Sequence, residues 1–310
     1  MDRIAIQLTE RFGNDLADSK RLYDMPLRGE GHTVNVQYDP YNRRLKFFEL
    51  TPEDVRANDA IADALREADG GELYSKVIVY ARPDQNDGWR KAGLRREAVI
   101  WGFFGNGDNA ELWTRYPLTL RSQDVRQDEG DRITALAVEK DVVEPVLPSG
   151  YTCAPASEAD APEIAKLLAA TFKDYPTPIS TSVVAAAIRD RTSHFRIVRN
   201  VEGELVACAS AEIHHTRKSA ELTDCATRTD QRGNGLMSRI LRALEEDLAG
   251  EFGITDVYTI ARAYEPGMNC SFAKLGYRYT GRLVNNCRMP DGFESMNVWC
   301  RNTREPVEVS

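Results

Sequence analysis

The chain has 310 residues, of which 42% are hydrophobic and 8% aromatic, so it is long enough for two globular domains that each bury a core. Its formal net charge of −8 argues against nucleic acid as a main partner, because binding a phosphate backbone requires a basic face. The first residues, MDRIAIQLTERFGND, carry charges where a signal peptide is apolar, and no apolar run is long enough to cross a bilayer. We therefore expect a cytoplasmic protein without a membrane partner.

Cysteine and histidine usage argues against disulfides and metal sites. All six cysteines lie in the second half, and none belongs to a Cys-x-x-Cys pair, which favours reduced thiols. The adjacent His214 and His215 resemble half of a metal site, but only two other histidines occur and no acidic residue stands at ligand spacing. We expect these histidines to lie in a polar loop and the protein to hold no metal.

The first half alternates strand-like and helix-like segments. Thr51 is a typical N-cap residue before Pro52, and Gly70-Gly71 is a typical stop, so the sequence predicts a helix over about 52–68. The charged segment 122–132 predicts neither type of element. Apolar runs predict strands over 34–37, 44–50, 75–81, 99–104 and 111–116.

A stretch rich in proline and glycine, from Pro145 to Gly150, separates the two halves. We place a boundary there, between a domain of residues 1–145 and a domain of residues 149–303. The second domain is predicted to contain, in order, a helix opened by Ser157, a helix over 183–191, strands over 195–199, 205–213 and 220–227, a helix from 236 to about 250, and a strand over 256–261.

The stretch from Glu221 to Leu244 carries the strongest local signal. A strand-like run leads into the turn Arg232-Gly233-Asn234-Gly235, and apolar residues then recur at helical spacing from Leu236. A glycine turn at a helix start leaves backbone N–H groups aimed outward, and the helix dipole adds positive charge there, which suits a phosphate group. The Walker and Rossmann patterns are both absent at this turn. Because glycine turns also open helices that bind nothing, the turn alone leaves phosphate binding open.

The turn resembles the R-G-x-G signature of the GNAT N-acetyltransferases, and the predicted order of elements over 151–300 is the order of that family. The resemblance implies an α/β fold with a mixed, largely antiparallel central sheet, and acetyl-coenzyme A as co-substrate with its pyrophosphate on the turn amides. Met237 stands where the family usually has a small residue. The residues that the resemblance assigns to acetyl-coenzyme A are Cys225, Ala226, Thr227, Arg232, Gly233, Asn234, Gly235, Leu236, Met237, Asn269 and Phe272.

The segment 269–277, NCSFAKLGY, resembles a further GNAT element that packs beside the cofactor. Most members of the family place a tyrosine four residues before the glycine, as the acid that protonates the leaving thiolate. Phe272 holds that position here, before Gly276, so the usual acid is not carried over.

An internal repeat links the two halves. The segment 89–95, WRKAGLR, echoes the segment 272–278, FAKLGYR, and an Ala-Arg pair precedes each. We infer that residues 1–145 are a degenerate GNAT-like copy, and because this copy has no R-G-x-G turn we expect it to bind no cofactor. Chance similarity over so short a segment is the alternative.

Several blocks of the second half are similar to the β-lysine N6-acetyltransferases, which make the compatible solute N6-acetyl-β-lysine. This resemblance implies transfer of acetyl from acetyl-coenzyme A to the terminal amine of β-lysine. Composition and spacing alone indicate only an enzyme that transfers an acyl group from an acyl-coenzyme A to an amine. The blocks are FKDYPTPI (172–179), AELTDCAT (220–227), RGNGLM (232–237), ARA (261–263), GMN (267–269), GY (276–277), NN (285–286) and MNVW (296–299).

Acyl transfer requires a neutral amine, whereas an ammonium with a pKa of about 10.4 is almost fully protonated at neutral pH. Glu221 matches a glutamate in the similar strand of histone-acetylating GNAT enzymes, and we predict that it is the base; a solvated glutamate at a strand end is the alternative. In a regular strand Asp224 would lie on the opposite face, as a structural residue or a site for the second amine. Arg262 is the candidate for a substrate carboxylate, and Tyr175 and Tyr264 are further candidates for substrate contact.

Two other functions stay open at this point. In the first, the protein is an acetyltransferase that acts on a different small amine or on a protein lysine. In the second, it is a non-catalytic module that binds an acyl-coenzyme A, which the absence of the catalytic tyrosine at Phe272 would explain. The R-G-x-G turn together with Glu221 favours an enzyme. The sequence leaves a homodimer open.

Overall fold

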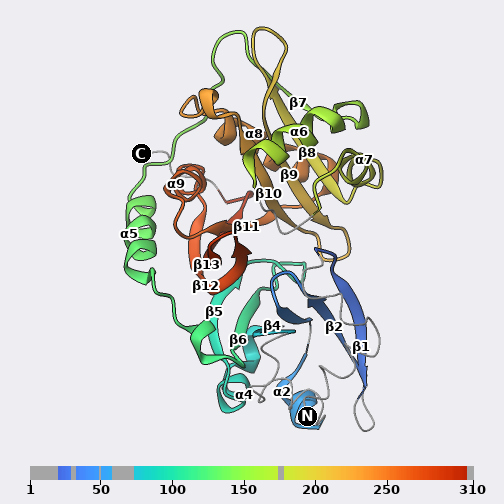
Figure 1. The fold of residues 1–310 in the computed structure, drawn as a ribbon, viewed down its shortest axis with the longest axis vertical. Coiled ribbons are helices and arrows are strands. Elements are labelled where there is room, and N and C mark those ends of the chain that lie inside the picture. The colour runs from blue at the N-terminus through green and yellow to red at the C-terminus, as the bar shows by residue number, and fades with distance from the viewer. Residues whose placement is uncertain (1–19, 29–32, 49, 58–72, 174–177, 306–310) are drawn as a thin grey trace. The chain divides into compact units, whose positions relative to one another are not determined.

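The computed structural model of the protein describes residues 20–28, 33–48, 50–57, 73–173 and 178–305 (Figure 1). The fold class is mixed α/β, as the sequence predicts. The chain divides into two compact units. Unit 1 comprises Met1–Val99, Asn109–Gln127 and Gly281–Met296, and unit 2 comprises Ile100–Asp108, Asp128–Thr280 and Asn297–Ser310.

Unit 1 contains, in chain order, β1 (Tyr23–Arg28), β2 (Thr33–Asp39), β3 (Arg44–Phe48), α2 (Pro52–Ala57), β4 (Lys76–Ala81), η3 (Pro83–Gln85), α4 (Asn86–Lys91), β5 (Arg95–Ile100), β6 (Ala110–Arg115) and η4 (Thr119–Ser122). The strands form one sheet in the order β1-β2-β3-β4-β6-β5. Strands β3 and β4 are parallel, and β1–β2, β2–β3 and β4–β6 are antiparallel. The core of unit 1 includes Tyr38, Phe47, Trp89 and Trp113.

Helix α5 (Gln127–Val138) leads into unit 2, which then contains β7 (Thr152–Pro155), η5 (Glu158–Asp160), α6 (Ala161–Thr171), α7 (Thr181–Arg189), β8 (Ser193–Arg199), β9 (Leu205–His214), β10 (Ser219–Thr227), η6 (Thr229–Gln231), α8 (Leu236–Asp247), η7 (Leu248–Phe252), β11 (Asp256–Arg262), α9 (Pro266–Lys274), β12 (Arg278–Met289) and β13 (Gly292–Asn302). The strand order is β12-β13-β11-β10-β9-β8-β7. Residues 281–296, in the hairpin of β12 and β13, belong to unit 1.

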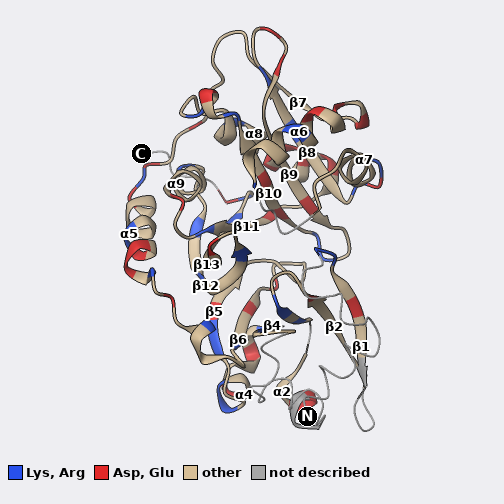
Figure 2. Ribbon diagram, viewed as in Figure 1, with Lys and Arg blue, Asp and Glu red and all other residues tan. Residues whose placement is uncertain are grey.

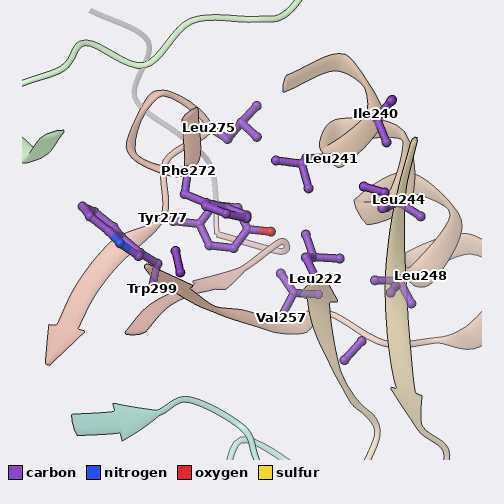
Figure 3. Close-up of a cluster of buried hydrophobic side chains, with 14 of the residues drawn as sticks. Leu222, Ile240, Leu241, Leu244, Leu248, Val257, Phe272, Leu275, Tyr277 and Trp299 are labelled. Atoms are coloured by element: carbon purple, nitrogen blue, oxygen red, sulfur yellow. The ribbon is translucent and has the colours of Figure 1, made fainter. Parts of the chain in front are cut away.

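Helix α8 is fixed by one apolar face. Ile240, Leu241 and Leu244 recur at helical spacing, and all three are fully buried in a cluster that also holds Leu222 of β10 and Val257 of β11 (Figure 3). Because this face packs on the sheet, the turn that precedes α8 is held at the end of β10.

Two predicted helix starts are confirmed. The Thr51 hydroxyl accepts a hydrogen bond from the backbone N–H of Asp54 at 3.2 Å, and the Asp54 carboxylate accepts one from the Thr51 N–H at 2.9 Å. Ser157 and Asp160 form the same kind of capping box before α6. The predicted extension of the first helix over 58–68 lies outside the described residues.

The two sheets repeat one strand order. β1-β2-β3-β4-β6-β5 of unit 1 corresponds to β8-β9-β10-β11-β13-β12, with a parallel pair at the same place in each, β3–β4 and β10–β11. The predicted sequence repeat falls at equivalent points, the ends of α4 and α9. There the N–H of Leu94 donates to the Trp89 carbonyl at 3.1 Å, and the N–H of Tyr277 donates to the Phe272 carbonyl at 3.1 Å. The repeat is therefore structural and supports duplication of one unit.

Two stretches differ from the sequence prediction. The apolar run 99–104 predicts a strand, but β5 ends at Ile100 and the chain then turns. Gly102 and Gly105 have φ of +61° and +85°, which strand backbone does not adopt, and Phe103 is buried within the turn. The run is apolar because the turn is buried. The charged segment 122–132 contains the start of α5.

Buried polar contacts inside unit 1 hold the segment 281–296. The Lys76 ammonium donates to the Glu97 carboxylate at 3.0 Å and to the Val284 carbonyl at 2.8 Å, and the Tyr116 hydroxyl donates to Glu97 at 2.5 Å. Burial lowers the pKa of Lys76 to about 8, against the opposing effect of Glu97. Arg121 adds a bond from Nε to the Asn285 carbonyl at 3.2 Å. Unit 1 therefore supplies the partners of this hairpin segment.

We expect residues 149–310 expressed alone to be less soluble and to melt at a lower temperature than the full chain. The fragment lacks Lys76, Glu97 and Arg121, so the polar groups of residues 281–296 lose buried partners. In the full chain, Glu97→Gln should reproduce part of the loss, about 3–5 kcal/mol for breaking a buried pair. Circular dichroism melts check both, and a fragment with the same melting temperature as the full chain would show that residues 1–148 are not needed to stabilise residues 281–296.

Candidate active site

Strands β10 and β11 are paired only at their first residues. Their parallel ladder joins Ser219, Ala220 and Glu221 to residues 256–258 and ends there. The next link is made by a side chain, since the buried Thr259 hydroxyl donates to the Leu222 carbonyl at 2.8 Å. The strands thus part after Glu221, and a parted pair of strands leaves backbone groups that a ligand can pair with.

A β-bulge lies in β10 just after this point. The register with β9 shifts between Thr223 and Ala226, and Asp224 has a φ of +53°, in the left-handed region. The Ser210 hydroxyl donates to the Asp224 carboxylate at 2.7 Å. Ser210 pairs with Thr223, so the two side chains lie on the same face of the sheet. Side chains alternate between faces along a strand, so Glu221, two residues before Thr223, also lies on this face. The prediction that Glu221 and Asp224 lie on opposite faces is therefore wrong, because Asp224 itself stands in the bulge, where the regular alternation of faces is broken.

The three residues after Asp224 differ in their surroundings. Cys225 packs against the cluster that contains Leu222, whereas Ala226 is fully buried in the cluster beneath α6 and α7, and Thr227 is half-buried. Burial and the Asp224 carboxylate raise the pKa of the Cys225 thiol. The Cys225 thiol is therefore protonated at neutral pH and is a poor nucleophile. This argues against a mechanism in which an acyl group is first bound to Cys225.

The turn before α8 has the free space and the uncapped helix start that binding a phosphate requires. Gly233 and Gly235 have φ of +83° and +71°, Gly235 is the N-cap of α8, and no side chain caps this helix. A Cβ added at Gly233 would meet nothing within 4 Å. The first backbone N–H groups of α8 are thus available to an anion, and the residues present fit a pyrophosphate.

The side chains of the turn contribute differently from its backbone. Leu236 is 1% exposed and Met237 packs against the core, so each can offer a ligand only its N–H. Asn234 donates to the Gln231 carbonyl at 3.2 Å, and Arg232 donates to the Thr227 carbonyl at 3.4 Å. Figure 2 colours the positions of the charged residues along the ribbon. Arg228, just before this turn, pairs with Glu204 and Asp230, whereas Arg232 directly precedes the glycines.

Two predicted cofactor residues lie in the core. Phe272 is 1% exposed and packs edge to face on Tyr277, with ring centroids 5.1 Å apart (Figure 3). Asn269 is fully buried, and its amide already makes four hydrogen bonds within the protein. The Phe272 side chain therefore has almost no exposed surface, and the hydrogen-bonding groups of the Asn269 amide are all used within the protein.

The predicted substrate residues lie around the end of β11. Arg262 is half-exposed and its Nη1 lies 3.0 Å from the Glu265 carboxylate, while Tyr264 is 8% exposed. Tyr175 lies outside the described residues. Sequence reasoning missed Ser210 and Thr259, although each is a polar residue within an apolar strand, and that contrast is the signal that finds them.

Comparison of this sequence with known proteins identifies its family. A model of the acetyltransferase (GNAT) family matches residues 162–277. The chain is 35% identical over 266 residues to a β-lysine N(6)-acetyltransferase of Methanosarcina mazei, across 78% of this chain and 97% of that protein. It is 31% identical over 276 residues to the N-acetyltransferase YodP of Bacillus subtilis, across 89% of this chain and 98% of that protein. The chain belongs to the GNAT acetyltransferase family.

This acetyltransferase is an acyl-transferring enzyme, and GNAT enzymes take the acetyl group from acetyl-coenzyme A. A spermidine N-acetyltransferase of Vibrio cholerae aligns with a TM-score of 0.46 and 15% identity over 53% of this chain and 99% of that chain. In the described residues, no group of three or more His, Cys, Asp or Glu side chains is placed to hold a metal ion. None of the helices in the described ranges has both the length and the apolar composition that crossing a bilayer requires.

We expect Gly233→Ala to weaken acetyl-coenzyme A binding by at least about tenfold, because the methyl group would occupy the space where a phosphate meets the backbone. Gly203 is a matched control, since it has a φ of +80° and an added Cβ there also meets nothing within 4 Å. Both variants should lose about 1–2 kcal/mol of stability from left-handed strain. Calorimetry should give one site per wild-type chain. Equal affinity for the two variants would place the cofactor elsewhere.

Proposed function

We propose that the protein transfers the acetyl group of acetyl-coenzyme A to the terminal N6 amine of β-lysine, giving N6-acetyl-β-lysine. The observation that carries this proposal is the similarity to the β-lysine N(6)-acetyltransferase of Methanosarcina mazei along nearly all of that protein. In the reaction the amine nitrogen bonds to the acetyl carbonyl carbon, the carbon–sulfur bond breaks, and the ammonium proton leaves to a base. The nitrogen loses a second proton to water as the amide forms, and the thiolate of coenzyme A takes up a proton from water, since Phe272 cannot donate one.

The cofactor is proposed to lie along the turn and the parted strands. Backbone N–H groups of residues 233–237 hold the pyrophosphate, with Arg232 as the nearby cation. The backbone of residues 225–227, beyond the β10–β11 ladder, pairs with the chain that carries the thioester. What supports this placement is that both sets of backbone groups lie where no helix cap or β11 ladder uses them.

Only unit 2 is proposed to hold acetyl-coenzyme A. The equivalent helix of unit 1 is α2, and Thr51 and Asp54 cap it with their side chains. At the start of α2, Pro52 has no N–H and the Asp54 N–H is already donated to Thr51, whereas α8 has no side-chain cap. We therefore infer that residues 1–145 keep the fold of a GNAT unit without its anion site.

Glu221 is proposed as the general base. It is the last residue of β10 that pairs with β11, so it stands where the strands part, and its side chain is half-buried. Asp224 shares its face, but the bond from Ser210 and the left-handed backbone tie Asp224 to the bulge. We infer that Glu221 receives the ammonium proton, directly or through water, and that Asp224 holds the bulge in place.

Glu221→Gln should lower kcat by about 10²–10⁴ at pH 7 with little change in acetyl-coenzyme A affinity, since the amide keeps the shape and loses the basicity. The loss should shrink as the pH rises towards the amine pKa of about 10.4, where free amine forms without help. Asp224→Asn should instead lower stability or raise the amine KM. Steady-state kinetics from pH 7 to 10 test this, and near-normal kcat for Glu221→Gln with an inactive Asp224→Asn would make Asp224 the base.

Arg262 is proposed to bind the β-lysine carboxylate, exchanging Glu265 for the substrate. Arg262→Gln should raise the KM for β-lysine by roughly ten- to a hundredfold, the equivalent of about 1.5–3 kcal/mol for a charged hydrogen bond. The KM for a diamine of the same length without a carboxylate should stay the same. Glu265→Gln is the control, because it removes the Glu265 carboxylate from Arg262 and leaves the charge of Arg262 in place. A parallel rise for both amines would contradict the assignment.

A further inference from the structure

Asn269 joins three elements of unit 2 through one side-chain amide. Its Nδ2 donates to the Arg262 carbonyl at 2.9 Å and to the Glu265 carbonyl at 2.8 Å. Its Oδ1 accepts from Asn297 Nδ2 at 2.9 Å and from Trp299 Nε1 at 2.9 Å. A primary amide has two donor hydrogens and two acceptor lone pairs, so this one is fully used.

The four bonds fix a short turn from two sides. Arg262 ends β11 and Glu265 is the N-cap of α9, so the donors of Asn269 close the turn 262–265. On its acceptor side the amide is held by β13, where Asn297 also donates to the Thr134 hydroxyl of α5 at 3.0 Å. The turn is thereby tied to two elements far from it in the sequence.

We propose that Asn269 is a positioning residue for amine recognition, which sets the turn 262–265 so that the Arg262 guanidinium faces the substrate carboxylate. The inference rests on the proposed role of Arg262. It departs from the sequence expectation, which gave Asn269 to acetyl-coenzyme A, because a fully buried and fully bonded amide has nothing to offer a cofactor.

The physical reason lies in how the turn would relax. Without the amide, the carbonyls of Arg262 and Glu265 each lose their shorter hydrogen bond. They keep only long backbone bonds, 3.3 Å from the Glu265 N–H and 3.5 Å from the Asn269 N–H, so the turn is held less tightly. Because Arg262 begins the turn, its side chain moves with it, and small displacements of a positioning group weaken recognition strongly. The first N–H groups of α8 and the backbone of β10 are not bonded to Asn269, so cofactor binding should be spared.

The test compares Asn269→Ser with wild type in the full-length enzyme. The KM for β-lysine should rise by roughly tenfold, while the KM for the diamine without a carboxylate and the Kd for acetyl-coenzyme A stay within about twofold. The double variant with Arg262→Gln should be no worse than Arg262→Gln alone, because both changes remove one contact. Trp299→Phe is the milder second variant, since it removes one donor and leaves both donors of Asn269 in place.

Asn200→Ala is the control for a merely structural loss. Asn200 lies in the turn between β8 and β9, where its side chain accepts from the N–H groups of Glu202 and Glu204. It should lower the melting temperature without a carboxylate-specific change in KM. The inference is overturned if Asn269→Ser behaves as Asn200→Ala does, or if its acetyl-coenzyme A Kd rises as far as its amine KM. Wild-type enzyme that acetylates no amine would overturn the proposed function itself, before any variant is made.

Discussion

The parting of β10 and β11 is the constraint on which the site depends. Two parallel strands normally pair along their length, so separation after Glu221 must be held by something else. The Thr259 hydroxyl satisfies the Leu222 carbonyl at the point of separation, and the bulge at Asp224, tied to Ser210, turns β10 away from a regular course. These side-chain bonds stand where a regular ladder would continue, and the backbone beyond Glu221, the proposed base, is not paired with β11.

The two units share one strand order, although we propose an acetyl-coenzyme A site in unit 2 alone. Both units have the same strand order and the same helix end at α4 and α9, so the fold alone does not decide which unit is catalytic. We propose that the start of the helix after the third shared strand decides it. Thr51 and Asp54 close that position in unit 1, whereas glycines leave it open in unit 2. Within unit 1, Lys76 and Arg121 hold residues 281–296 of the same unit.

Sequence patterns predicted what depends on neighbouring residues. The glycine turn, the apolar face of α8 and the capping boxes at Thr51 and Ser157 are all local, and each is found where it was expected. The facing of Asp224 was missed because a bulge is set by the partner strand, where Ser210 lies. The burial of Asn269 was missed for the same kind of reason, since its partners come from β13.

We propose an acetyl-coenzyme A-dependent transfer whose acceptor is the terminal amine of β-lysine. The decisive experiment measures thiol release by the purified full-length protein with β-lysine, α-lysine and a histone peptide, and locates the acetyl group by mass spectrometry. We expect the highest kcat/KM for β-lysine, with acetyl on its N6 amine. Faster transfer to the histone peptide or to α-lysine, or no release with any amine, would contradict it.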